Sequence, residues 1–309
     1  MKAITTERRN PSSYGLDEKS TAEILKILNR EDARVAPAVR RTLRSIAKAV
    51  DAIVASWKSG GRLFYIGAGT SGRLAVLDAA ECPPTFGTSP AMVQAVIAGG
   101  ARALRAAVEG AEDSRANGAK DLRRAGVSRR DVVVGIAASG GTPYVLGALE
   151  FARRRGAVTI GVTSNPRSPL ARTAQIAIAP ETGPEAIAGS TRLKAGTAQK
   201  MVLNMLSTAA MVRMGRVYDN WMVAVALTNR KLQRRGARIL EEASGVSPSR
   251  AEHALRLAGH NLPTALVMLR TGSSVREARR RLAKTGGNVR QALVAGMPSS
   301  KRSGSKARG

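Results

Sequence analysis

Apolar positions along the chain follow two periodicities, and this pattern predicts the order of helices and strands. Residues 20–58 carry apolar side chains at three- and four-residue spacing, which is typical of amphipathic helices. From residue 62 onward, short apolar runs alternate with helical segments. The pattern predicts strands within 62–69, 92–100, 131–140, 157–165 and 175–180. It predicts helices over 71–80, most of 101–126, 143–155 and about 197–214.

Strands that alternate with helices indicate an α/β fold with a doubly wound parallel sheet. Ligands of such sheets bind at the carboxyl ends of the strands. The loops that follow the predicted strands are therefore the places to look for a site.

The last part of the chain has a different pattern. Residues 246–293 contain no strand signal and three helical stretches, over 247–259, 261–272 and 274–293. We therefore expect four segments along the chain. They are an N-terminal segment with helices that pack on the central domain (1–58), the central α/β domain (59–245), a small helical module (246–297) and a disordered basic tail (298–309).

Charge changes this picture little. The 309 residues are 43% hydrophobic, enough for a core, and they carry a net charge of +28. Such an excess first suggests nucleic acid as a partner. The excess is spread along the chain, although residues 246–309 are the densest part, with 13 Lys and Arg against 2 Asp and Glu. We expect nucleic acid to bind non-specifically if it binds.

Several classes of site are excluded by what the sequence lacks. Cys82 is the one cysteine, which fits a reducing cytoplasm, and neither a signal peptide nor a membrane-spanning run is found. His253 and His260 both lie near the C-terminus, so the central domain holds no multi-histidine metal site and no Ser-His-Asp triad. We expect a cytoplasmic protein that uses carboxylates, hydroxyls, Lys, Arg or backbone amides, without a metal.

A glycine loop follows the first predicted strand. Residues 67–72 read Gly-Ala-Gly-Thr-Ser-Gly, which formally matches the dinucleotide-binding pattern. That pattern also needs an acidic residue about 20 positions later, and residues 82–108 contain no Asp or Glu. A phosphate monoester at the helix N-terminus fits the loop better, and a plain tight turn is the alternative.

Three more strand exits carry hydroxyls. Residues 138–143 (Ala-Ser-Gly-Gly-Thr-Pro), 163–166 (Thr-Ser-Asn-Pro) and 189–194 (Gly-Ser-Thr-Arg-Leu-Lys) resemble the first loop in composition. Four such loops in one sheet indicate a small ligand that is phosphorylated and polyhydroxylated.

Two glutamates are candidates for acid-base work. Glu81 comes at the predicted end of the first loop's helix, before Pro83 and Pro84, which we expect to end that helix. Glu112 follows Gly110, which interrupts a helical pattern. Two carboxyl groups in different protonation states can supply an acid and a base at one centre. The alternative is that each is an ordinary helix-end or salt-bridge residue.

Longer motifs resemble one family. These are GAGTSGRLAVLDAAECPPTFG, VEGAEDS, VVVGIAASGGTPYV and GSTRLKAGTAQKMVLNMLST, and the N-terminal TTERRNPSSYGLD is similar as well. They resemble the N-acetylmuramic acid 6-phosphate etherases over residues 5–295 or so. The resemblance implies a sugar-isomerase (SIS) fold with a C-terminal helical domain like the ubiquitin-associated domain, in a homodimer. It implies cofactor-free cleavage of the lactyl ether of N-acetylmuramic acid 6-phosphate to N-acetylglucosamine 6-phosphate and D-lactate, in cell-wall recycling.

The resemblance also assigns residues. Glu81 matches the family's proton donor and Glu112 its second catalytic glutamate. Ser71, Ser139 and Thr142 would bind the phosphate, with further polar contacts from Thr70, Ser190 and Lys194. Gly141 stands where the family commonly has Arg, a residue suited to bidentate anion recognition.

Two related functions stay open at this point. Glucokinase regulatory proteins share the architecture, so a non-catalytic sugar-phosphate sensor is one alternative. A sugar-phosphate isomerase of the same fold is the other, and it would release no lactate. A sensor needs no acid-base pair, so the presence of both Glu81 and Glu112 favours the enzyme.

Overall fold

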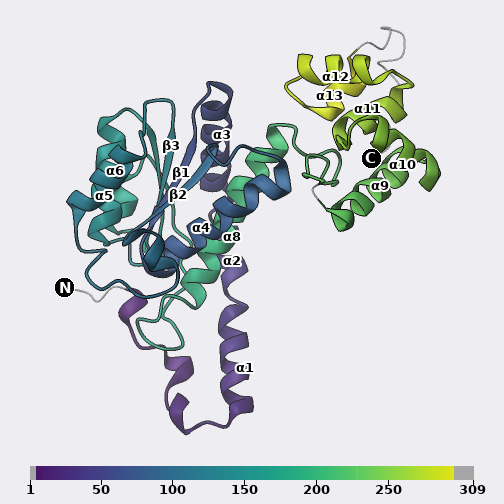
Figure 1. The fold of residues 1–309 in the computed structure, drawn as a ribbon. Coiled ribbons are helices and arrows are strands. Elements are labelled where there is room, and N and C mark those ends of the chain that lie inside the picture. Colours follow the sequence, from purple (N-terminus) through teal and green to yellow (C-terminus); the bar gives the residue numbers. More distant parts are fainter. Residues whose placement is uncertain (1–4, 228, 296–309) are drawn as a thin grey trace. The chain divides into compact units, whose positions relative to one another are not determined.

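The computed structural model describes residues 5–227 and 229–295 (Figure 1). The chain forms two compact units, each described by itself below. The first, an α/β unit, comprises residues 1–81 and 89–210, and the second, a helical unit, comprises residues 82–88 and 211–309. The predicted tail at 298–309 lies outside the described residues.

The α/β unit contains one sheet of five parallel strands. The strand order is β2-β1-β3-β4-β5, and all neighbouring pairs are parallel. Every residue of β1 and β3 is buried, as expected for strands covered on both faces. The strands are β1 (Leu63–Gly67), β2 (Val93–Ile97), β3 (Val132–Ile136), β4 (Val158–Val162) and β5 (Ile176–Ile178).

Helices cover both faces of this sheet. Figure 1 shows α5 and α6 on one side and α3, α4 and α8 on the other, which confirms the predicted doubly wound α/β fold. The α-helices of this part of the chain are α1 (Thr21–Asp32), α2 (Val35–Arg40), α3 (Leu43–Lys58), α4 (Gly69–Phe86), α5 (Arg115–Arg124), α6 (Pro143–Arg154), α7 (Pro169–Thr173) and α8 (Lys194–Arg213). The 3-10 turns are Thr5–Glu7, Pro11–Ser13, Leu16–Glu18 and Gly100–Leu104.

Local sequence explains several of these helices. Ser20 and Glu23 form a reciprocal capping box at the start of α1. The apolar face of α3, which includes Ile46, Val50 and Ile53, is buried, and α3 packs on β1, β3 and β5.

Two predicted helices differ in the structure. Pro83 and Pro84 do not end α4, which continues through both to Phe86. The φ of proline suits a helix, and both prolines lie close to the helix end, so the missing N–H groups affect the last turns alone. The predicted helix over 101–126 is also too long. A turn precedes Ser114, where Gly110 has a φ of +69°, and Ser114 caps the shorter α5.

The α5–α6 contact is unusually close because two glycines face the opposing backbones. A Cβ on Gly118 would lie 1.9 Å from the carbonyl oxygen of Tyr144, and one on Gly147 would lie 2.1 Å from that of Arg115. The two helices therefore form one rigid layer over the buried side chains of β1 and β3.

The helical unit has its own core. Its buried members include Leu240, Leu255, Leu266 and Val289, one from each of four helices. The predicted stretch 274–293 is two helices, separated at Gly286 and Gly287, which both have positive φ. The helices are α9 (Arg230–Ser244), α10 (Pro248–Leu257), α11 (Leu262–Thr271), α12 (Val275–Lys284) and α13 (Val289–Val294). The expected likeness to a ubiquitin-associated domain stays a prediction.

Within the described ranges, no helix combines the length and the apolar character that a membrane crossing requires.

Candidate functional site

The strand order reverses once, between β1 and β3. β2 lies on one side of β1 and the strands β3, β4 and β5 follow on the other. Gly67 at the end of β1 pairs with Ile136 at the end of β3, so the loops after both strands leave the sheet side by side. A reversal of this kind opens a crevice at the carboxyl edge of the sheet, where ligands of doubly wound folds bind. Two of the sequence-predicted loops, 67–72 and 138–143, meet at this edge.

The loop after β1 turns tightly into α4. A Cβ on Gly67 would lie 2.8 Å from the backbone N of Gly72, and one on Gly72 would lie 2.5 Å from the side chain of Ile97. Glycine is therefore required at both places for the turn to close. Thr70 is partly buried and Ser71 is buried, both in the first turn of α4, where the helix dipole favours an anion.

The loop after β3 leads into α6 in a similar way. Gly140 has a φ of +71°, and a Cβ there would lie 2.2 Å from Oγ of Ser168. The Oγ of Ser139 accepts a hydrogen bond from the backbone N of Gly141 at 3.2 Å. Thr142 is the N-cap residue of α6, and its side chain makes no capping hydrogen bond. The hydroxyl that would normally cap the helix can therefore bind a ligand at its N-terminus.

Glu112 is tied to the same end of α6 by its backbone. Its carbonyl oxygen accepts a hydrogen bond of 2.9 Å from the backbone N of Tyr144, the second residue of α6, while its residue surface is exposed. The Tyr144 hydroxyl donates to Asp121 at 2.7 Å. Burial, and then Asp121, raise the pKa of Tyr144, so this anchor stays protonated. Glu112 thus lies beside the 138–143 loop.

Glu81 lies farther along α4. It is exposed and follows Ser71 by ten residues, about 15 Å along the helix axis. The turn that carries it is fixed by Asp78, whose carboxylate accepts hydrogen bonds from Tyr65 on β1 and from Asn204 and Ser207 on α8. The backbone from which Glu81 projects is therefore rigid.

The 189–194 loop differs from the other two because a carboxylate already fills the helix end that it precedes. Both oxygens of Glu185 accept hydrogen bonds at the start of α8, from the backbone N of Lys194 at 3.0 Å and of Ala195 at 2.9 Å. Burial raises the pKa of Glu185 despite these bonds. Ser190 is partly buried, and its backbone N donates to the carbonyl of Ile187.

Lys194 belongs to a buried cluster in this structure. Its side chain is 2% exposed, and its ammonium forms an ion pair with Glu31, which also accepts a hydrogen bond from Asn10 at 2.7 Å. Such a pair fixes the start of α8 against α1. The role of Lys194 as a substrate contact stays a prediction.

Gln199 is the residue of this region that the sequence patterns did not single out. It is 2% exposed, and its Oε1 accepts a hydrogen bond of 2.9 Å from the hydroxyl of Ser71. Its Nε2 is buried and has no hydrogen-bond partner in the described part of the chain. The available signal was a polar residue among the apolar buried side chains of α8, such as Val202, Leu203 and Leu206, but Lys194 and Ser207 of the same helix are buried polar residues as well.

Among residues 5–227 and 229–295, no group of three or more His, Cys, Asp or Glu side chains is arranged to hold a metal ion.

This chain is similar to known proteins over most of its length. Residues 45–153 match the family described as the glucokinase regulatory protein N-terminal SIS domain, and residues 111–209 match the SIS domain. The N-acetylmuramic acid 6-phosphate etherase of Serratia proteamaculans (strain 568) is 53% identical over 94% of this chain and 98% of its own length. That of Edwardsiella ictaluri (strain 93-146) is 54% identical over 95% and 98%. The crystal structure of a putative phosphosugar isomerase involved in capsule formation from Bacteroides fragilis NCTC 9343 aligns with a TM-score of 0.49 and 21% identity, over 65% of this chain and 95% of that one.

Proposed function

The chain belongs to the N-acetylmuramic acid 6-phosphate etherase family, and on this basis we propose that it cleaves the D-lactyl ether of N-acetylmuramic acid 6-phosphate. The products are N-acetylglucosamine 6-phosphate and D-lactate, and the reaction serves cell-wall recycling. The observation that carries the proposal is the meeting of two hydroxyl-bearing helix N-termini, of α4 and α6, at the single reversal of the sheet. The sensor and isomerase alternatives are not favoured by the etherase relatives.

The phosphate would bind between these two helix ends. Ser71, Ser139 and Thr142 supply hydroxyls there, and the first turns of both helices supply backbone N–H groups and positive dipole ends. Thr70, Ser190 and Lys194 are further candidates for polar contacts with the sugar. The net positive charge of the protein would steer a substrate that carries a phosphate and a carboxylate.

The chemistry needs an acid and a base. In the ring-opened sugar, the C2–H bond lies beside the aldehyde, so Glu112 can take this proton and the aldehyde stabilises the resulting carbanion as an enolate. The electron pair then forms the C2–C3 double bond as the C3–O bond breaks, and Glu81 donates a proton to the departing lactate oxygen. Glu81 next takes a proton from water, whose oxygen adds to C3, and C2 regains a proton from Glu112.

The proposed route requires no cofactor. The enolate is stabilised by the substrate's own aldehyde, so residues of this chain suffice for each proton transfer. We propose that the enzyme is a carbon–oxygen lyase of the hydro-lyase type and that it works in the cytoplasm.

We also propose that the active form is a homodimer whose sites are completed by the second copy. Glu81 is exposed and stands about 15 Å along α4 from Ser71, whereas Glu112 lies beside the N-terminus of α6. A second copy related by two-fold symmetry can bring its own Glu81 to the loops of the first.

The test is D-lactate release from N-acetylmuramic acid 6-phosphate in D₂O, with the wild type, Glu81→Gln and Glu112→Gln. We expect the wild type to release D-lactate and to leave deuterium at C2. Glu112→Gln should lose both signals, whereas Glu81→Gln should still exchange C2 hydrogen while releasing almost no lactate. Binding of the substrate by the wild type without turnover would contradict the proposal, and the reverse pattern of the two variants would exchange the roles of the glutamates.

A further inference from the structure

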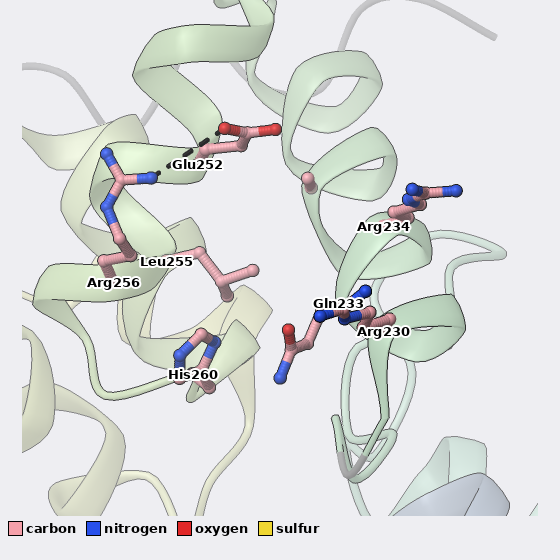
Figure 2. A pocket seen from close by; sticks show the side chains of 8 residues that line it. Arg230, Gln233, Arg234, Glu252, Leu255, Arg256 and His260 are labelled. Carbon is pink, nitrogen blue, oxygen red and sulfur yellow. Dashed lines mark ion pairs between the residues drawn. The ribbon is translucent and has the colours of Figure 1, made fainter.

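Arginines that line a common pocket in this chain do not all face it. A pocket of about 260 Å³ lies between α9 and α10 in the helical unit. Figure 2 shows that Arg234 points away from this space and that Arg256 lies beside Glu252, its ion-pair partner at 3.8 Å. Both arginines are exposed and contribute charge to the surface. Arg73 of the α/β unit differs, because its guanidinium binds the backbone of another segment.

Arg73 joins α4 to the segment that follows β2. It comes directly after Gly72, the last glycine of the first loop, and is partly buried. Its Nε donates a hydrogen bond of 2.9 Å to the carbonyl oxygen of Ala103, and its Nη2 donates one of 3.2 Å to that of Ala106. Ala103 belongs to the 3-10 turn Gly100–Leu104, and Ala106 to the loop after it.

Residues 104–113 have little buried surface of their own. Val108 and Ala111 are partly buried, and the other residues of this stretch are exposed. Gly99 makes room for Val108, since a Cβ on Gly99 would lie 2.9 Å from the Cβ of Val108. A segment with so few buried contacts opens easily unless hydrogen bonds hold it. The two hydrogen bonds from Arg73 therefore contribute much of its order.

Glu112 lies near the far end of this segment. Its carbonyl oxygen accepts a hydrogen bond of 2.9 Å from the backbone N of Tyr144. Two residues later, the Ser114 side chain accepts a hydrogen bond from the backbone N of Asn117 and so begins α5. These contacts fix the far end of the segment, and Arg73 fixes the near end. The position of the Glu112 backbone depends on both.

The contact with two carbonyl groups suits arginine in particular. A guanidinium offers several N–H groups in a rigid plane, so two of them can bind separate acceptors at once. A lysine ammonium is a point charge on a flexible stem and has no such fixed pair of donors. Arg73 also follows Ser71 by two residues. The turn of α4 at which the phosphate would bind therefore carries the side chain that holds the 104–113 segment.

We propose that Arg73 is a positioning residue, which holds the 104–113 segment so that Glu112 reaches C2 of a sugar whose phosphate lies at Ser71. Arg73 acts through the backbone of that segment and touches no reacting atom. The inference rests on the proposed etherase function, because it takes Glu112 as the base at C2. Misplacing a reacting group by about 1 Å costs on the order of a hundredfold in rate, so a loose segment should slow the reaction strongly.

The experiment compares three variants of the full chain with the wild type. Arg73→Met removes every donor and keeps a long side chain that suits a helix. Arg73→Lys keeps the charge but replaces the paired donors with one ammonium. Arg105→Met is the matched control, because it removes the same charge from an exposed position of the same segment. Thermal unfolding is measured first, and Arg73→Lys carries the test if Arg73→Met does not fold.

We expect a loss in kcat that follows the number of carbonyl groups bound. In the lactate assay, Arg73→Met should lose about 100-fold in kcat while KM stays within about threefold. Arg73→Lys should lose about tenfold, and Arg105→Met less than about twofold. Deuterium entry at C2 in D₂O should slow by the same factor as lactate release, because Glu112 takes that proton. In calorimetric titration, all variants should bind N-acetylglucosamine 6-phosphate within about threefold of the wild type, since both phosphate loops are intact.

Amide hydrogen exchange, measured by mass spectrometry, reports on the segment directly. Peptides that cover residues 104–113 should exchange about tenfold faster in Arg73→Met than in the wild type and should be unchanged in Arg105→Met. In an active enzyme, unchanged exchange or a rise in KM without a loss in kcat would overturn the inference. Full activity of Arg73→Lys would also overturn it, because charge alone would then suffice. A wild type that releases no lactate would instead overturn the proposed function, and the role of Arg73 with it.

Discussion

The hydroxyl of Ser71 donates a hydrogen bond of 2.9 Å to Oε1 of Gln199, which leaves Nε2 of Gln199 buried and without a partner in the described residues. Ser71 stands in the first turn of α4, where the phosphate is proposed to bind. To donate its proton to a phosphate oxygen, Ser71 must release Oε1. A rotation of the amide then lets Nε2 donate to Ser71 Oγ, so Ser71 can donate to the phosphate and accept from Gln199 at the same time.

Replacing Gln199 by Glu should weaken substrate binding. The carboxylate can accept the Ser71 proton but has no N–H to offer in return, and its charge repels the phosphate. We expect KM to rise about tenfold or more while kcat changes less. Thr197→Glu is the control, since it adds the same charge at an exposed position of α8. Equal effects of both changes on KM would show that Gln199 acts through charge alone.

Gly140→Ala should disturb the loop after β3. The position has a φ of +71°, and the added Cβ would lie 2.2 Å from Ser168 Oγ and 2.7 Å from Thr163 Oγ1. We expect a loss of about 1–3 kcal/mol in the free energy of unfolding and a strong loss of turnover. Urea unfolding and lactate release measure the two effects. Gly141→Ala next to it should be nearly neutral, because its Cβ would meet Ser139 Oγ at 3.8 Å and little else.

Gly141→Arg should fold and bind substrate more tightly. The position is exposed and its φ lies outside the left-handed region. The resemblance described above implies an Arg at this place in the family. A guanidinium beside Ser139 and Thr142 would add a charge-assisted contact to the phosphate or the lactate carboxylate. We expect KM to fall about three- to tenfold in the lactate assay. Gly141→Gln, which is long but uncharged, should show little of this gain.

Mixing Glu81→Gln with Glu112→Gln tests whether one site uses two copies. If each site takes Glu81 from one copy and Glu112 from the other, a mixed dimer has one site with both glutamates intact. Random reassociation should then restore about a quarter of wild-type activity. Activity is measured after joint refolding, and each variant refolded alone is the control. A mixture that stays inactive would mean that both glutamates come from the same chain.

Asp131 should make stability depend on pH. Its buried carboxylate accepts hydrogen bonds from Arg62 and Ser128. Burial alone would raise its pKa, but together these bonds outweigh it and lower the pKa. Because the folded pKa lies below the unfolded value of about 3.9, the carboxylate stabilises the fold above about pH 4. This contribution is lost as pH falls through the folded pKa.

Asp131→Asn should therefore lose about 2–3 kcal/mol of unfolding free energy at pH 7. The difference from the wild type should shrink as urea unfolding is repeated toward pH 3. The exposed Asp51→Asn is the control and should follow the wild type at both pH values. A constant difference between Asp131→Asn and the wild type across this range would contradict the assignment.

Features that depend on a short stretch of the chain could be predicted from the sequence. The loops at 67–72 and 138–143 were predicted because glycines and hydroxyls at a strand end are visible in six residues, and the structure brings both to one edge. The alternation of strands and helices likewise gave the sheet, whose burial on both faces is plain from the apolar runs in β1 and β3.

What depends on distant contacts was not predictable in this way. Gln199 meets Ser71 across 128 positions, and Lys194 meets Glu31 across 163. No local pattern distinguishes a lysine that contacts a ligand from one that is buried in an ion pair. The sequence analysis expected Pro83 and Pro84 to end α4, because proline lacks the N–H group that a helix interior needs. The helix continues to Phe86, and both prolines lie close to that end, where few hydrogen bonds are lost.

The carboxylate of Glu185 blocks a possible phosphate site at the start of α8. It makes with Lys194 and Ala195 the two backbone hydrogen bonds that a phosphate oxygen could otherwise receive. Glu185 thus occupies the N-terminus of α8, so a phosphorylated metabolite finds no free backbone N–H groups at these two positions. A single change to a shorter residue at position 185 would expose a third helix end to anions, so this position is a natural point at which descendants of the fold could gain a new ligand.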